Sequence, residues 1–218
     1  MNADTPTLEV QNLQTHFFTK AGVVKAVNDV SFTVKKGEVL GLVGESGSGK
    51  SVTGLSLIGL IDAPGEVVGG EILFKGRDLT GLGDTALREV RGKEIAMIFQ
   101  DSLAALNPVL TIGEQMTEAI TEHGGASAAE ARERAIAALR QVGITSPEER
   151  FEQYPHEFSG GMRQRVAIAT ALLNHPDLII ADEPTTALDV TIQGQILAEM
   201  QTLQRETGTA IIWITHDL

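Results

Sequence analysis

The chain has 218 residues, 42% of them hydrophobic, which is enough to bury a core in one domain with a lobe or insertion. Its formal net charge of −12 argues against a nucleic-acid binder, because phosphate contacts need clustered lysine and arginine. The absence of cysteine excludes disulfides and thiolate metal sites, and no apolar stretch approaches the ~20 residues that span a bilayer. No basic segment followed by an apolar run opens the chain, so we expect no signal peptide.

Short strands are predicted in the first hundred residues, from β-branched or apolar runs bounded by Gly, Lys and Asp. These runs are residues 8–10, 30–34, 39–43, 72–74 and 95–99. A run that is compatible with a helix begins at Ser51, directly after a glycine-rich segment.

From Ile112 to about Leu173 the apolar period becomes helical. One predicted helix covers residues 130–142 and ends at Gly143, a plausible C-cap, and a second covers residues 161–173. The tail then predicts a strand at 178–181, a helix at about 191–206 and a strand at 210–215. Both tail strands are continuous apolar runs, as in a parallel sheet that is covered on both faces. The chain is therefore predicted to be α/β with a mostly helical insertion.

The glycine-rich segment fits the phosphate-loop pattern G-x-x-x-x-G-K-[ST]. It consists of Gly44, Glu45, Ser46, Gly47, Ser48, Gly49, Lys50 and Ser51. A strand, a tight glycine loop and a helix together aim backbone N–H groups and the positive end of the helix at one point. Lys50 would reach the β- and γ-phosphates of a nucleotide, and Ser51 would place its hydroxyl on Mg²⁺. The alternative is a flexible Gly/Ser turn before a helix.

Two acids follow the predicted strand at 178–181, at the edge where ligands bind in open α/β folds. Asp182 suits the coordination of Mg²⁺ through water, and Glu183 can polarise an attacking water. Taken alone, the pair could simply be an exposed strand end, but a phosphate loop in the same chain favours the catalytic interpretation.

The segment from Phe158 to Arg165, with Ser159, Gly160 and Gly161, resembles the signature sequence of ABC ATPases. The resemblance extends over essentially the whole chain. It implies a P-loop NTPase fold with a RecA-like, mostly parallel core, an N-terminal antiparallel β subdomain and a helical insertion. The implied single ABC ATPase domain comprises residues 1–100 and 175–218 as the nucleotide-binding core and 101–174 as the helical, signature-bearing subdomain.

The same resemblance assigns roles to further residues. Phe17 lies at the position of the aromatic residue that stacks on adenine, Gln100 resembles the Q-loop glutamine, and His216 resembles the switch histidine. Ala187 to Asp189 resembles the D-loop. Gln100 would touch Mg²⁺ and the water, and His216 would contact the γ-phosphate. Each has a simpler alternative: Phe17 as a core residue beside Phe18, Gln100 on the surface and His216 in a loop.

Ser159 could likewise be only the N-cap of the following helix, although that use and a contact to nucleotide can coexist. Residues 100–108, 154–158 and 182–191 resemble the peptide and nickel importer branch. Two positions depart from the pattern. Ser102 stands where that branch usually has proline, and Met162 replaces the commoner glutamine, which hints at a heterodimeric partner.

The resemblance implies an ATPase that drives the uptake of peptides or a related solute, with ATP and Mg²⁺ as cofactors. Two such domains would meet head to tail, so that Ser159, Gly160, Gly161 and Asp189 serve the ATP held by the other subunit. The implied partners are a second ATPase, two membrane permease subunits and, indirectly, an extracytoplasmic solute-binding protein, at the inner face of the plasma membrane. Alternatives are a soluble ABC ATPase outside transport, or an inactive fragment truncated after the switch histidine. The solute itself (peptide, nickel, glutathione or opine) is left open.

Overall fold

The computed structural model describes residues 5–101, 105–124, 126–186 and 188–216. Two four-stranded sheets organise the chain: an antiparallel sheet in the order β2-β1-β4-β5 and a parallel sheet in the order β3-β8-β7-β6. The strands are β1 Leu8–Thr19, β2 Gly22–Val34, β3 Val39–Val43, β4 Gly65–Phe74, β5 Arg77–Asp78, β6 Ile95–Ile98, β7 Leu178–Asp182 and β8 Ala210–Thr215.

The helices fall into two groups. α1 Lys50–Leu57 and α2 Asp84–Arg88 pack with the antiparallel sheet, whereas α8 Val190–Thr207 connects β7 to β8 and packs on the side of the helical layer. The others follow β6 and form a separate layer: α4 Ile112–Gly124, α5 Ala128–Gln141, α6 Pro147–Phe151, the 3₁₀ turn η1 Pro155–Glu157 and α7 Gly160–Leu172. This arrangement confirms the predicted α/β fold with an antiparallel subdomain and a helical insertion.

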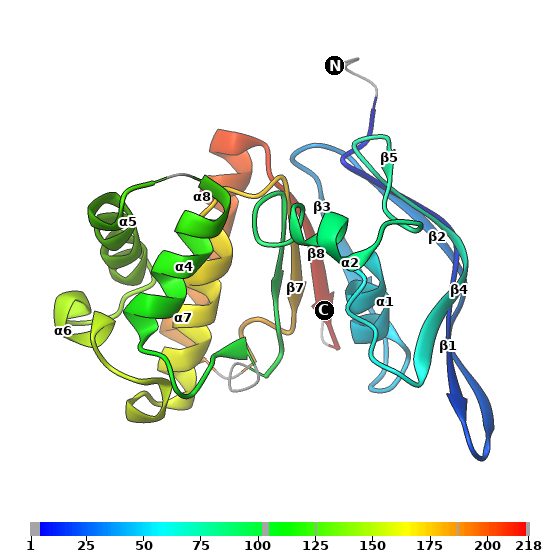
Figure 1. Cartoon of the computed structure of the whole chain (residues 1–218), viewed down its shortest axis with the longest axis horizontal. Coiled ribbons are helices and arrows are strands. Elements are labelled where there is room, and N and C mark those ends of the chain that lie inside the picture. Colours follow the sequence, from blue (N-terminus) through cyan, green and yellow to red (C-terminus); the bar gives the residue numbers. More distant parts are fainter. Residues whose placement is uncertain (1–4, 102–104, 125, 187, 217–218) are drawn as a thin grey trace.

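The parallel sheet is the middle layer, and β7 shows why. Its side chains alternate: Leu178 and Ile180 belong to the apolar cluster shared with α1 and the antiparallel sheet, whereas Ile179 and Ala181 belong to the cluster shared with the helical layer. Successive side chains of a strand point to opposite faces, so a strand covered on both sides must be apolar throughout. Figure 1 shows the three layers, with α4, α5 and α7 on one side of β7 and β8 and α1 on the other.

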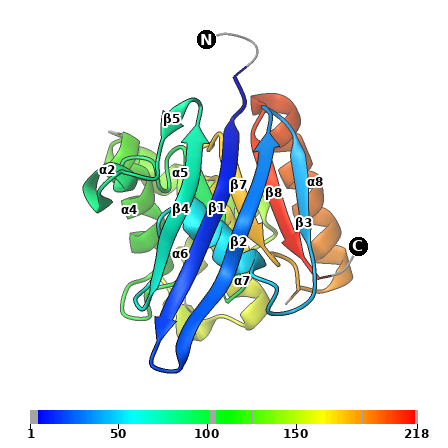
Figure 2. The ribbon, with the colours of Figure 1, turned by 90° about the vertical axis from the view of Figure 1, so that its right-hand side faces the viewer.

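The antiparallel strands are longer than predicted. β1 has 12 residues and β4 has 10, because each continues through polar and glycine positions that hide the alternation. β1 pairs with both neighbours through register shifts near Leu13 and Thr15, and such bulges also break a period of two. Figure 2 shows β4, β1 and β2 side by side, lying across α1.

The helical layer begins and ends largely where the sequence predicts. Ser127 caps α5, its hydroxyl accepting from the Glu130 backbone N–H while the Glu130 carboxylate accepts from the Ser127 N–H. Gly143 follows this helix with a φ of 72°, a conformation that favours glycine. None of the helices in the described part of the chain is long and apolar enough to cross a membrane.

Candidate nucleotide site

The phosphate loop runs from the end of β3 to the start of α1, as the sequence predicts. Gly47 and Gly49 have φ values of 77° and 92°, which favour glycine over residues with a Cβ. A Cβ on Gly49 would also lie 2.2 Å from the carbonyl oxygen of Ala26 in β2. The loop is therefore held by its own backbone and by close contact with the antiparallel sheet.

Lys50 stands at the mouth of this loop. Its Nζ donates to the carbonyl oxygens of Gly44 at 2.7 Å and Glu45 at 2.8 Å. Thr53 fixes the first turn of α1, its backbone N–H and its hydroxyl both donating to the Gly49 carbonyl. The ammonium group thus rests on two neutral acceptors, and phosphate oxygens would offer it a stronger, charge-assisted bond.

Asp182 ends β7 beside the phosphate loop. It is only 4% exposed, and the Ser51 side chain is near enough to act on the pKa of its carboxyl group. Burial raises the pKa of Asp182 and the charge of Glu183 adds to this, while Ser51 and Lys50 act in the opposite direction. Among the described residues nothing hydrogen-bonds to its buried Oδ1. A buried carboxylate oxygen without a partner, next to a hydroxyl, fits the oxygen ligands that Mg²⁺ prefers.

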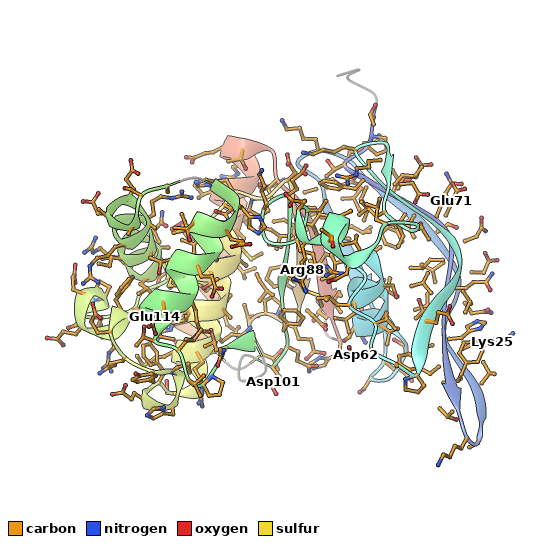
Figure 3. The ribbon with its side chains drawn as sticks, in the orientation of Figure 1. Lys25, Asp62, Glu71, Arg88, Asp101 and Glu114 are labelled. Atoms are coloured by element: carbon orange, nitrogen blue, oxygen red, sulfur yellow. The ribbon has the colours of Figure 1, made fainter. Side chains whose placement is uncertain are left out.

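Glu183 lies between two of the predicted site residues. Gln100 Nε2 donates to its Oε2 at 2.9 Å, and His216 Nδ1 lies 2.9 Å from its Oε1. The glutamate adopts a φ of 46°, and its side chain is 13% exposed. The three residues follow β6, β7 and β8, whose carboxyl ends meet at one edge because the strands are parallel. Figure 3 labels Asp101, directly after Gln100, at the lower edge of the molecule where these strands end.

The structure adds a residue to this group that the sequence analysis missed. The Thr186 hydroxyl lies 3.4 Å from Glu183 Oε2, on the same oxygen that Gln100 contacts. Gln100, which the resemblance assigned to Mg²⁺, is placed against Glu183, and within the described part of the chain no hydrogen bond joins it to Asp182. Thr186 lies within residues 182–191, which resemble the importer branch, but the resemblance gave it no role and its loop has no periodicity that could single it out.

The Phe17–Phe18 pair is separated by the alternation of β1. Phe17 is half-buried, and a Cβ on Gly65 would lie 2.6 Å from its ring, whereas Phe18 is 48% exposed. Phe17 shares its strand face with Thr15, whose hydroxyl lies 2.7 Å from that of Ser56 in α1. The ring therefore lies on the α1 side of the sheet, and its contact with a base stays a prediction.

The signature segment lies apart from these groups. Ser159 is the N-cap of α7, its Oγ accepting from the Met162 N–H at 3.3 Å, and a Cβ on exposed Gly160 would meet no atom within 4 Å. Gly161, half-buried, follows in the first turn. Within the described ranges no hydrogen bond or ion pair joins this segment to the phosphate loop, and α7 and α1 cover opposite faces of the parallel sheet (Figure 1).

Asp189 is likewise exposed and caps a helix, its Oδ1 accepting from the Ile192 N–H at the start of α8. Two positions that the sequence analysis discussed, Ala187 of the D-loop and Ser102, lie outside the described residues. The structure thus assembles the phosphate loop, Asp182, Glu183, Gln100 and His216 at one edge, and leaves Ser159 and Asp189 as exposed helix starts.

Comparisons with known proteins show which family the chain is similar to. Residues 27–186 match the family described as ABC transporter. A probable peptide ABC transporter ATP-binding protein of Sinorhizobium fredii is 55% identical over 212 residues, and a dipeptide transport ATP-binding protein of Bacillus subtilis is 54% identical over 212 residues. Each alignment covers 97% of this chain, and the chain spans 63% of the length of each relative.

A solved structure, a dimeric post-hydrolysis state of an ATP-binding cassette bound to ADP and Pi, superposes with a TM-score of 0.86 at 33% identity. The match covers 96% of this chain and 88% of that chain. The similarity therefore extends over nearly the whole chain and includes both sheets and the helical layer.

Proposed function

This chain belongs to the ABC transporter family, and on that premise we propose that it binds ATP and hydrolyses it as the ATP-binding subunit of a peptide importer. The observation that carries the proposal is the meeting of a phosphate loop with a doubly hydrogen-bonded glutamate. Lys50 closes the loop, and Glu183 is held by Gln100 and His216 at the same edge of the sheet.

The loop would bind the triphosphate. Its backbone N–H groups and the N-terminus of α1 would face the phosphates, and the Lys50 ammonium would exchange its two carbonyl partners for phosphate oxygens. Ser51 and Asp182 would hold Mg²⁺, which supplies charge neutralisation on the phosphate oxygens when bound. The buried, unpartnered Oδ1 of Asp182 supports this assignment. Phe17 would contact the adenine.

Glu183 would act on the attacking water. One carboxylate oxygen of Glu183 would accept a proton from the water while the oxygen of the water forms a bond to the γ-phosphorus. The bond from the γ-phosphorus to the leaving ADP oxygen breaks in the same step. Gln100 and His216 keep the carboxylate in place from two sides. A carboxylate that is held in this way loses no further orientational freedom at the moment of reaction.

The exposed starts of α7 and α8 complete the proposal. Ser159, Gly160, Gly161 and Asp189 would contact the ATP of a second ATPase subunit, a heterodimeric one by preference, and the dimeric solved relative supports pairing. Residues 101–174, the helical subdomain of the single ATPase domain, would contact two membrane permease subunits at the inner face of the membrane, with a solute-binding protein beyond them. The names of the relatives support peptides as the solute.

Two substitutions test the function. Glu183→Gln keeps the shape and the Gln100 contact but removes the base, so we expect turnover to fall by about 10²- to 10⁴-fold with ATP still bound. Lys50→Ala removes a charge-assisted contact and should weaken ATP binding itself. Both are measured on the purified chain and on the chain reconstituted with its membrane partners, by titration with a fluorescent ATP analogue and by phosphate release.

The matched control is Glu133→Gln, the same change on the exposed face of α5, which should alter neither quantity. Robust steady-state hydrolysis by Glu183→Gln in the reconstituted complex would overturn the assignment of the base. Unchanged nucleotide affinity in Lys50→Ala would overturn the assignment of the phosphate loop.

A further inference from the structure

A buried glutamine in the signature helix joins that helix to the catalytic edge. Gln164 of α7 is 1% exposed, and it lies one turn and a half after Ser159. Its Nε2 donates to the Pro184 carbonyl oxygen at 3.0 Å and lies 3.4 Å from that of Phe99. One amide group therefore connects α7 to the chain segments that leave β7 and β6.

The orientation of this amide follows from its neighbours. Both nearby groups are carbonyl oxygens, which can only accept, so the NH₂ end must face them. The other end, Oε1, is buried and has no hydrogen-bond partner among the described residues. An apolar side chain of similar length would avoid that desolvation penalty, so the amide is poorly suited to packing alone and well suited to fixing the two carbonyls.

The two carbonyls belong to residues that flank the catalytic pair. Phe99 directly precedes Gln100, Pro184 directly follows Glu183, and the Gln100 and Glu183 side chains are themselves hydrogen-bonded at 2.9 Å. β6 and β7 are paired in parallel up to Ile98 and Ala181, and beyond that point the ladder no longer holds the two backbones together. Directly after the end of the β6–β7 ladder, the Gln164 amide connects the two backbones through the Phe99 and Pro184 carbonyls.

We propose that Gln164 is a positioning residue that sets the separation of Gln100 and Glu183 and ties it to the position of the signature helix. A movement of α7 relative to the sheet would then be transmitted to the glutamate that activates the water. The inference rests on the proposed function, because it assigns to this link the role of coupling helix position to hydrolysis.

The first experiment separates catalysis from binding. Gln164→Met keeps the length and removes both donors, so kcat for ATP should fall about tenfold while ATP affinity stays within about twofold. The matched control is Gln204→Met, which removes an amide donated to the Gly37 carbonyl far from the catalytic edge. That variant should lose thermal stability and keep its kcat. An unchanged kcat in folded Gln164→Met, in an active wild-type preparation, overturns the proposal.

The second experiment does not need activity. The chain has no cysteine, so spin labels at His156→Cys, before α7, and Gln201→Cys, on α8, report the position of the signature helix against the core. We expect a narrow distance distribution by pulsed electron resonance in the labelled parent and in Gln204→Met, and a broadened or shifted one in Gln164→Met. An identical distribution in Gln164→Met overturns the mechanical link.

The two measurements separate this inference from the proposed function. If no version binds or hydrolyses ATP but the distance distribution changes in Gln164→Met, the proposed ATPase function is wrong and the positioning role of Gln164 stands. If Gln164→Met hydrolyses ATP normally and shows normal distances, the positioning role of Gln164 is wrong and the proposed ATPase function stands.

Discussion

The phosphate loop and the glutamate cluster lie at one edge of the sheet but are built in different ways. The loop is a single run of eight residues, Gly44–Ser51, shaped by its own glycines. The cluster joins Gln100, Glu183 and His216, which are separated by up to 116 positions in the chain. One half of the site depends on local backbone conformation, and the other on the order of strands in the sheet.

The two halves also differ in exposure. β3, which leads into the loop, is an edge strand with Val39 52% exposed, whereas every residue of β7, which leads into the cluster, is buried. The comparison teaches that the loop is held by its backbone conformation, whereas Glu183 of the cluster follows a buried strand and is held by side-chain contacts with Gln100 and His216, which are themselves exposed. Substitutions in each half should therefore fail in different ways.

The largest effect is expected in the loop. Gly49→Ala forces a Cβ to within 2.2 Å of the Ala26 carbonyl at a φ of 92°, and we expect a loss of about 3 kcal/mol in the free energy of unfolding together with weaker ATP binding. Chemical denaturation and nucleotide titration measure the two effects.

Gly194→Ala is the control for this change. A Cβ at Gly194, inside α8, meets no atom within 4 Å, so the same substitution should stabilise the chain by about 0.5–1 kcal/mol through helix propensity. Equal stability of the two variants would contradict the claim that the loop is shaped by contact with β2.

An intermediate effect is expected in the cluster. His216→Ala removes the side chain that contacts Oε1 of Glu183, so kcat should fall between about 10- and 100-fold with ATP affinity little changed, because the loop is intact. Phosphate release under single-turnover conditions measures this, with His123→Ala on α4 as a control that should behave as wild type. A loss of ATP affinity instead of kcat would remove the distinction between the two halves.

The smallest effect is expected from Asp182→Asn, on thermal stability. Asp182 ends β7, directly before Glu183. Because burial raises its folded pKa, the folded chain binds this proton more tightly than the unfolded chain, and stability falls as the pH rises from the ordinary value of 3.8 through the raised one. Without ligands, Asp182→Asn should therefore unfold at a higher temperature than wild type at pH 7 and at nearly the same temperature below pH 3.8. Thermal unfolding at the two pH values is the measurement. A variant less stable than wild type at pH 7 would contradict burial as the main cause.

Much of the fold was predictable because its helices and strands depend on residues that are close together in the sequence. The helices α5, α7 and α8 begin and end within one or two residues of their predicted bounds, since capping side chains and apolar period lie in the same few residues. β1 and β4 were underestimated because register shifts and glycines interrupt their alternation. Gln164 was missed as well, although a polar residue one turn before buried Ile168 on a helix face was a usable signal.

The sequence by itself determined the glycine loop at residues 44–51, the helix start at Ser159 and the two-sided burial of β7, because each depends on residues within about one turn or one strand of each other. Only the tertiary structure decided that Glu183 is held by Gln100 and His216 and that Asp182 keeps a buried oxygen unpartnered. Those contacts require β6, β7 and β8 to lie side by side in parallel, and strand order is a property of the whole sheet that no local pattern carries.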